Sequence, residues 1–223
     1  MLVAVAVVPH PPVLLPEVAG DGAPELAELR RACDRVVADL VRSGPDVVVV
    51  LCSGEVGRTQ DHRVPASAAP YGLPGPTGSI LGLGHTVGSR LLDRAGWDAE
   101  RRVYRTVTGD PVDLPPGRVA LLVAADGSAR RSESAPGPYD PRAVRFDAAV
   151  ARALAGGDVE ALGDLDLVLA DELWARGAPA LRSLARTLRT QQGAAVEARV
   201  DLDAAPYGVG YLCASWTVRG AGE

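Results

Sequence analysis

Three short runs of apolar residues constrain the fold of this chain more than any other feature of its sequence. The runs show no alternation of polar and apolar positions, and each is too short to span a membrane as a helix. Such runs are typical of parallel strands that helices cover on both faces, because both sides of the strand are then buried. The three runs are Leu2–Val8, Val47–Leu51 and Val119–Ala124.

The segment between the first two runs has the pattern of a helix. From Pro24 to Arg42, apolar residues recur at steps of three and four, which places them in one stripe. Pro24 suits the first turn of a helix, and Gly44-Pro45 predicts its end. The order strand, helix, strand predicts a βαβ unit with a right-handed crossover.

Later segments continue the alternation of helices and strands. The patterns predict helices over 86–95, 142–154, 162–174 and 179–188, and strands over 102–107, 196–202 and 208–218. With 223 residues and 47% hydrophobic side chains, the chain is long enough to bury one large core. The sequence therefore predicts one α/β domain over residues 1–223, with a central, mostly parallel sheet flanked by helices.

The composition favours a cytoplasmic protein with a small-molecule ligand. The net charge is −5 and the arginines are scattered among acidic residues, so we expect no nucleic-acid partner. The first apolar run has no basic leader and is broken by Pro9, which argues against a signal peptide and a membrane partner. The three cysteines lie far apart in apolar patterns, as buried reduced thiols do. A homo-oligomeric state is left open.

His10 is the leading candidate for a functional residue. It follows the first apolar run within Val7-Val8-Pro9-His10-Pro11-Pro12, where the prolines fix the backbone and prevent a helix. The turn therefore holds the imidazole rigidly at the end of a strand. Histidine is the commonest metal ligand and the usual proton carrier near neutral pH, so this position suggests a functional role. The alternative is an ordinary surface or capped loop histidine, which is the more common case for a lone histidine.

Polar residues also follow the other two apolar runs. Glu55 comes after Ser53-Gly54, and Asp126 and Arg130 follow the third run. Ligands of open α/β sheets bind outside the carboxyl ends of the strands. If the three strands are neighbours, we expect these residues to converge with His10.

The remaining histidines, His62 and His85, could reach the same crevice. One imidazole and one carboxylate can begin a divalent-metal site, and two histidines with one carboxylate form the facial triad of non-haem Fe(II) oxygenases. Each candidate also has a structural alternative. Glu55 could be a solvated loop acid, His62 an exposed loop residue and His85 a first-turn residue of a helix.

The chain has no phosphate-binding or nucleophile motif beside these residues. It contains neither a P-loop nor a Gly-x-Ser-x-Gly elbow. Leu81-Gly82-Leu83-Gly84 has no apolar strand before it, so we expect no nucleotide cofactor. The turn at Asp126-Gly127-Ser128 would offer free amides, which could bind an anion together with Arg130 and Arg131.

The order of several short motifs resembles that of a known family. The motifs are Val7-Val8-Pro9-His10-Pro11-Pro12, Ser53-Gly54-Glu55, Asp126-Gly127-Ser128, Phe146-Asp147 and Pro206-Tyr207-Gly208-Val209-Gly210-Tyr211. They are spread over nearly the whole chain, and together they resemble the catalytic chains of the class III extradiol ring-cleavage dioxygenases, whose superfamily fold the Memo proteins share. The resemblance implies an α/β fold with a mostly parallel sheet and an Fe(II) cofactor.

The resemblance also implies a set of site residues, of which this chain keeps one. In active members, Fe(II) is held by a histidine after the first strand, a histidine after the second strand and a glutamate from a later helix, and a further histidine is the acid/base. His10 matches the first ligand. Glu55 stands in place of the second histidine, Ala180 in place of the helical glutamate, and no histidine lies near Arg131.

Three functions are open on this sequence. The first is an Fe(II)-dependent oxidoreductase for a small aromatic or anionic substrate, with His10, Glu55 and His62 as metal ligands and Arg130 or Arg131 orienting the substrate. The second is a non-catalytic binding or scaffold module that keeps the fold. The third is a hydrolase or isomerase that needs no metal, in which His10 is the general base and Asp126 or Glu55 its partner.

Overall fold

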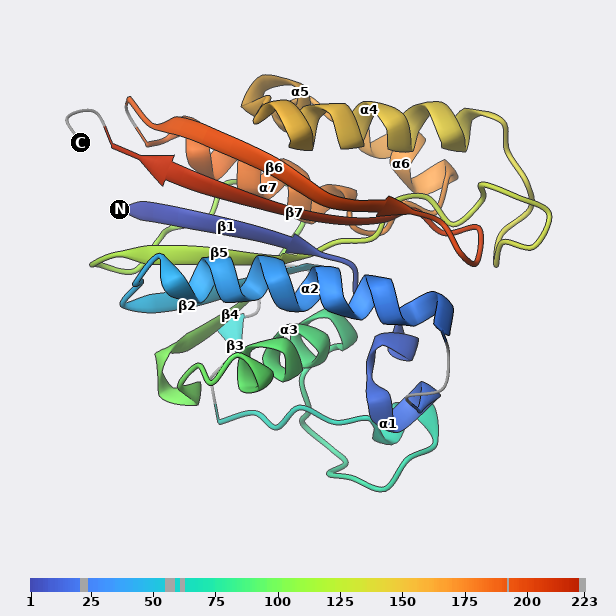
Figure 1. The fold of residues 1–223 in the computed structure, drawn as a ribbon, viewed down its shortest axis with the longest axis horizontal. Coiled ribbons are helices and arrows are strands. Elements are labelled where there is room, and N and C mark those ends of the chain that lie inside the picture. The colour runs from blue at the N-terminus through green and yellow to red at the C-terminus, as the bar shows by residue number, and fades with distance from the viewer. Residues whose placement is uncertain (21–23, 55–58, 61–62, 192, 221–223) are drawn as a thin grey trace.

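A seven-stranded sheet with helices on both faces forms the body of the molecule (Figure 1). The computed structural model describes residues 1–20, 24–54, 59–60, 63–191 and 193–220. The strands are β1 (Leu2–Val8), β2 (Val47–Ser53), β3 (Thr59–Gln60), β4 (Arg102–Val107), β5 (Val119–Ala124), β6 (Ala195–Ala204) and β7 (Tyr211–Arg219). The helices are α1 (Pro16–Ala19), α2 (Pro24–Arg42), α3 (Leu83–Arg94), α4 (Arg142–Gly156), α5 (Val159–Gly163), α6 (Leu167–Glu172) and α7 (Ala178–Arg189). Short 3-10 turns lie at η1 (Pro12–Leu14), η2 (Ala69–Tyr71) and η3 (Ala99–Arg101).

Parallel strands form the centre of the sheet. The strand order is β3-β4-β2-β5-β1-β7-β6, in which β4, β2, β5 and β1 run parallel while β3, β7 and β6 pair antiparallel with their neighbours. β5 lies between β1 and β2, so the carboxyl ends of all three apolar strands meet at one edge. The prediction of one α/β domain with a central, mostly parallel sheet is confirmed.

The two faces of the sheet have separate cores, which explains the unbroken apolar runs. Successive side chains of β5 alternate between the faces. Ala120 and Leu122 belong to the core beneath α2 and α3, whereas Leu121 and Val123 belong to the core beneath α4 and α7. Every residue of β5 is buried, so a polar side chain at any of its positions would need a hydrogen-bond partner within one of the two cores.

The predicted helix over 162–174 is wrong, because two short helices, α5 and α6, take its place. The Asp166 carboxylate accepts hydrogen bonds from the amides of Val168 and Leu169, at 2.9 and 3.0 Å, and so begins a new helix. The apolar periodicity runs through this break and therefore did not reveal it. The other predicted helices and strands are present, with ends that move by up to three residues, as at Leu83, where α3 begins instead of at 86.

Two glycines allow α3 to lie unusually close to the sheet. A Cβ on Gly84 would collide with the Sγ of Cys52 and lie 3.0 Å from its Cβ, and a Cβ on Gly88 would lie 2.7 Å from Cγ1 of Val50. These residues are four apart and share one face of the helix. Of the two glycines noted in the sequence around Leu83, Gly84 therefore serves helix–sheet packing, whereas a Cβ on Gly82 would meet nothing within 4 Å. Gly84 brings the first turn of α3 to the carboxyl edge of β2.

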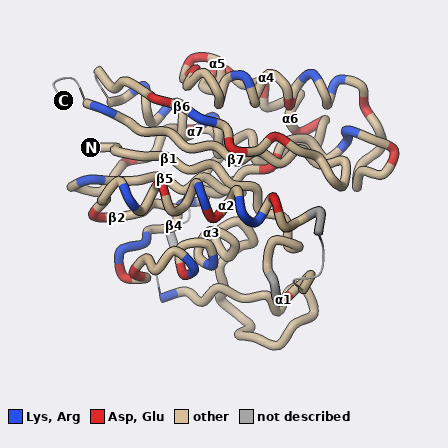
Figure 2. The backbone as a smooth tube through the Cα atoms, viewed as in Figure 1, with Lys and Arg blue, Asp and Glu red and all other residues tan. Residues whose placement is uncertain are grey.

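Charged residues of both signs are interspersed on the surface elements, as Figure 2 shows along α2, α4 and β6. Among the described residues, no helix has the length and apolar character needed to cross a membrane.

A test of this packing is the substitution Gly84→Ala. We expect it to lower the free energy of unfolding by about 1–3 kcal/mol, because the added methyl group must displace Cys52 or the helix. The matched control is Gly156→Ala in α4, where a Cβ would meet nothing within 4 Å. That change should be neutral or stabilise by up to about 1 kcal/mol, since alanine favours the helix. Urea unfolding of both variants measures the difference, and equal effects would contradict the close packing of α3.

Candidate active site

His10 and Asp126 meet at the carboxyl edge of β1 and β5. The amide of Ala125 donates to the carbonyl of Val8 at 2.8 Å, which is the last backbone contact between the strands. Beyond it, the His10 amide donates to Oδ1 of Asp126 at 2.7 Å. The side chain of Asp126 thus continues the pairing where the backbone ladder ends. The sequence-predicted pair is brought together by this contact.

The prolines around His10 make this contact the natural outcome of the sequence. Pro9, Pro11 and Pro12 have no amide hydrogen, so the His10 amide is the one backbone donor between residues 9 and 12. A buried donor must find an acceptor, and the Asp126 carboxylate is that acceptor. The turn therefore positions the carboxylate as well as the imidazole.

The His10 ring lies against the same carboxylate. Its Nδ1 is 3.6 Å from Oδ1 of Asp126, and the two side chains are only 12% and 18% exposed. Nδ1 is buried and makes no hydrogen bond within the described part of the chain. Burial raises the pKa of Asp126, and the nearby His10 ring and amide act in the opposite direction. A small shift of the ring would convert this contact into a charge-assisted hydrogen bond.

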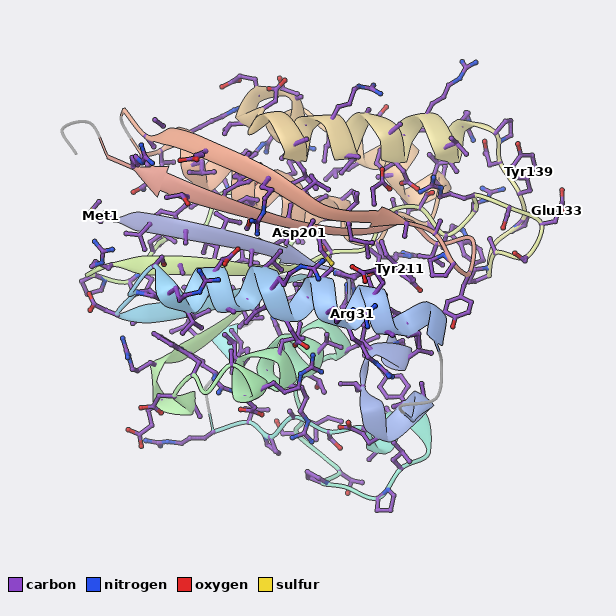
Figure 3. All side chains as sticks on the ribbon, in the orientation of Figure 1. Met1, Arg31, Glu133, Tyr139, Asp201 and Tyr211 are labelled. Atoms are coloured by element: carbon purple, nitrogen blue, oxygen red, sulfur yellow. The ribbon has the colours of Figure 1, made fainter. Side chains whose placement is uncertain are left out.

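Cys52 and Tyr211 surround the pair from neighbouring strands. Cys52 on β2 pairs with Ala124 on β5. Tyr211, which is labelled in Figure 3, is the first residue of β7. Burial raises the pKa of Cys52 to about 11, and the charge of Asp126 adds to this effect. Burial also raises the pKa of Tyr211, again with a contribution from Asp126. Both side chains are therefore neutral at physiological pH.

His85 supplies a second imidazole from the first turn of α3. Its Nε2 lies 3.1 Å from the carbonyl oxygen of Arg105, and its ring centroid is 5.5 Å from that of Tyr104. A carbonyl only accepts hydrogen bonds, so Nε2 carries the proton and Nδ1 is the unprotonated nitrogen of the ring. Burial lowers the pKa of His85 to about 4, and the nearby His10 contributes in the same direction. The sequence left open whether His85 reaches the site of His10, and in the structure His10 lies near enough to influence the pKa of this neutral ring.

The first turn of α7 closes the edge on the opposite face of the sheet. The amide of Gly177 donates to the carbonyl of Asp126 at 3.2 Å, and the amide of Ala180 donates to Oγ of Ser53 at 3.0 Å. Ser53 therefore caps a helix that is remote in the sequence. Ala180 stands at the position of the helical glutamate in the family that the chain resembles. It is fully buried, and its methyl group cannot bind a metal ion.

The other motifs that carried the resemblance form a structural clamp. Asp147 on α4 is buried and accepts from the amide and the hydroxyl of Ser128, at 2.8 and 2.7 Å. Gly127 and Gly210 lie so close to Asp147 that a Cβ on either would come within 2.7 and 2.5 Å of its carboxylate oxygens. The amide of Gly127 also donates to the carbonyl of Gly210 at 2.7 Å. Three motifs thus meet at one carboxylate and hold the segment that follows Asp126.

Arg130 points away from this site. Its Nε donates to the carbonyl of Pro138 at 2.6 Å and its Nη1 to the carbonyl of Glu172 at 2.5 Å, and Nη1 is 3.9 Å from Asp140. These contacts tie the loop before α4 to the end of α6. The guanidinium is thus engaged by protein groups, and the structure does not bring it to His10.

The predicted metal ligands Glu55 and His62 lie outside the described residues. Within residues 1–20, 24–54, 59–60, 63–191 and 193–220, no group of three histidine, cysteine, aspartate or glutamate side chains is arranged to hold a metal ion. His10 is the one member of the predicted ligand set whose position is described.

A cavity of about 370 Å³ opens beside the carboxyl end of β2, on the α6 and α7 side of the sheet. Its walls are mostly apolar, and Asp171 and Arg176 form an ion pair of 3.3 Å at its lining. A volume of this size suits a single small ring. A larger groove, about 520 Å³, lies between α2 and β6 and is lined by Asp39, Arg42, Glu197 and Arg199, remote from His10.

Comparison with known proteins shows the fold alone. No protein-family model matches the chain, and no curated protein matches its sequence. Among solved structures, the chain is similar to the uncharacterized protein JW3007 from Escherichia coli K12. The two share 13% sequence identity over 96% of this chain and 99% of that chain, with a TM-score of 0.52.

The neutral state of His85 predicts a pH dependence of stability. Its pKa falls from 6.5 to about 4 on folding, so between these values the unfolded chain binds a proton that the folded protein does not. The free energy of unfolding should therefore decrease as the pH falls from 6.5 to 4, by roughly 3 kcal/mol from this residue. His85→Gln keeps a donor for the Arg105 carbonyl and cannot titrate. Urea unfolding of both proteins across this range should show their difference shrinking toward low pH, and a constant difference would contradict the assignment.

The clamp at Asp147 predicts a large effect of Asp147→Ala. The substitution leaves the buried amide and hydroxyl of Ser128 without their acceptor, which should cost about 2–4 kcal/mol. Asp158→Ala is the control, since Asp158 caps α5 at the surface through one amide, that of Ala161. It should cost about 1 kcal/mol. Equal losses in chemical denaturation would show that Asp147 does not clamp the loop.

Proposed function

We propose that this chain is an enzyme that acts on a small aromatic or anionic molecule, with His10 at the centre of the reaction. We further propose that it is related to the class III extradiol ring-cleavage dioxygenases. The contact of the His10 ring and amide with the Asp126 carboxylate carries the proposal. This contact lies at the carboxyl edge of parallel strands, where ligands of open α/β sheets bind.

The arrangement suits a reactive imidazole in two respects. A carboxylate at Nδ1 orients the ring, favours the tautomer with its proton on Nδ1 and leaves Nε2 for a substrate or a metal ion. Neutral side chains border the pair, namely Cys52, His85 and Tyr211. Among the described residues around the pair, these three contribute no charge, so the negative charge at the site comes from the Asp126 carboxylate.

His10 is suited to be one ligand of an Fe(II) ion, but the described residues do not complete a set of metal ligands around it. The carboxylate–imidazole contact is what metal-binding histidines use to fix their orientation. In the proposal, Nε2 of His10 is one ligand, and Glu55 and His62 are the others. Bound Fe(II) would supply open positions for a catecholate and for O2. The chain's own contribution is to orient His10 through Asp126 and to keep water from a largely buried edge.

Proton transfer without a metal is the second candidate, and the same contact favours it. Nε2 of His10 would take a proton from a bound substrate, and Asp126 would stabilise the imidazolium that forms. This reaction needs neither Glu55 nor His62. The third candidate, a non-catalytic module, is favoured by Ala180, which brings a methyl group to the position of a ligand.

Anaerobic titration with Fe(II) tests the metal-dependent form of the proposal. We expect about one ion per chain in the unaltered protein, and loss of that ion in His10→Ala. Asp126→Asn keeps an oxygen for the His10 amide and removes the charge, so it should lower the affinity roughly 10–100-fold. The control Asp158→Asn makes the same change at the surface and should bind the metal normally.

Activity on a panel of catechols, followed by the visible absorbance of ring-cleavage products, separates the three candidates. Cleavage that requires Fe(II) and His10 supports the dioxygenase. Turnover of another substrate that survives a chelator and is lost in His10→Ala supports proton transfer, for which a base contributes about 10²–10⁴-fold. Absence of metal binding and of turnover, with His10→Ala indistinguishable from the unaltered protein, contradicts the proposal and leaves the non-catalytic module.

A further inference from the structure

Two of the three cysteines face each other in the core between α2 and β7. The Sγ atoms of Cys33 and Cys213 are 3.6 Å apart, and both residues are fully buried. Cys33 lies on α2 and Cys213 on β7, 180 positions apart in the chain. Both are free thiols, as is Cys52. The sequence predicted buried reduced thiols but gave no sign of this pairing.

We propose that Cys33 and Cys213 are a redox-sensitive pair that closes into a disulfide when the protein meets a peroxide. A disulfide has a sulfur–sulfur distance of about 2.05 Å, so the two sulfurs need to approach by roughly 1.5 Å. The elements that carry them are already packed together, since α2 lies directly on β7. The proposal requires rotations of the two side chains that bring the sulfurs from 3.6 Å into bonding range.

The reaction balances with hydrogen peroxide as the oxidant. The thiolate of one cysteine attacks a peroxide oxygen, the O–O bond breaks, and the hydroxide that leaves takes up a proton to become water. The resulting sulfenic acid is attacked by the sulfur of the second cysteine, the S–S bond forms, and a second water leaves. Both sulfurs are oxidised, and one peroxide is reduced to two waters.

The surroundings of the two cysteines make their oxidation slow when the peroxide concentration is low. The hydrogen bond with Cys33 and then burial raise the pKa of Cys213 well above its usual range. Thiolate is therefore scarce in the folded protein, and the reaction is slow at low peroxide. Asp201 and Arg35 are the charged groups that act on this thiol, and they do so in opposite directions.

The disulfide would change what holds β7 in place. Cys213 lies two residues after Tyr211, which begins β7 beside Asp126. In the reduced protein β7 is held by its neighbours β1 and β6 and by packing. In the oxidised protein a covalent bond would tie it to α2, close to the candidate active site.

Peroxide treatment of the folded, reduced protein tests the proposal. After the peroxide is removed, free thiols are alkylated under denaturing conditions and the chain is analysed by intact mass and non-reducing peptide mapping. We expect one alkylated cysteine, Cys52, and a linked pair of peptides containing Cys33 and Cys213. The thermal midpoint should rise by several degrees relative to the reduced protein, and a reductant should reverse the rise.

Single variants make the assignment specific. Cys52→Ala is the matched control and should form the link as the unaltered protein does. Cys33→Ala and Cys213→Ala should each form none. Three outcomes would overturn the proposal: separate oxidation of Cys33 and Cys213 to sulfinic acids, a link that involves Cys52, or a link that forms only after the chain is unfolded.

Discussion

The carboxylate of Asp126 extends the pairing of β1 with β5 past the last backbone hydrogen bond, and the arrangement of the site depends on this contact. Three prolines leave His10 as the one amide donor in its turn, and the strand order puts β5 beside β1. Oδ1 of Asp126 therefore accepts the hydrogen bond that follows the end of β1 and also lies beside the His10 ring. Removing the carboxylate would free the backbone of the turn as well as the ring.

Burial determines which titratable groups around this contact are neutral. Cys52, Tyr211 and His85 are held neutral because water is excluded from them, while Asp126 and His10 face each other across 3.6 Å. A site of this kind concentrates its electrostatic effect on whatever approaches the His10 ring. Gly84 and Gly88 permit the close approach of α3 to the sheet, and His85 on this helix and Cys52 beneath it are both buried.

The local parts of the structure follow from the sequence, and the long-range parts do not. The runs Leu2–Val8 and Val119–Ala124 became strands with those limits, because a strand buried on both faces is apolar at every position. The break at Asp166 was missed, since a helix cap needs only one residue and leaves the periodicity intact. Within the candidate site, His10 and Asp126 were predicted from their places at strand ends. The position of His85 depends on how α3 packs, and the role of Asp147 depends on two distant glycines, so neither could be read from spacing.

The pairing of β1 with strands that come much later in the sequence has a consequence for how the protein folds during synthesis. β1 is the first element of the chain, yet its partners in the sheet are β5 and β7, and β7 is the last element. During synthesis β1 therefore emerges long before either neighbour exists, and its apolar edges stay unpaired until residues 119–124 and 211–219 follow. Such distant pairings fold slowly and expose apolar strands to aggregation. Long stretches of sequence separate His10, Asp126 and Tyr211, so the site assembles only after residue 211 has left the ribosome.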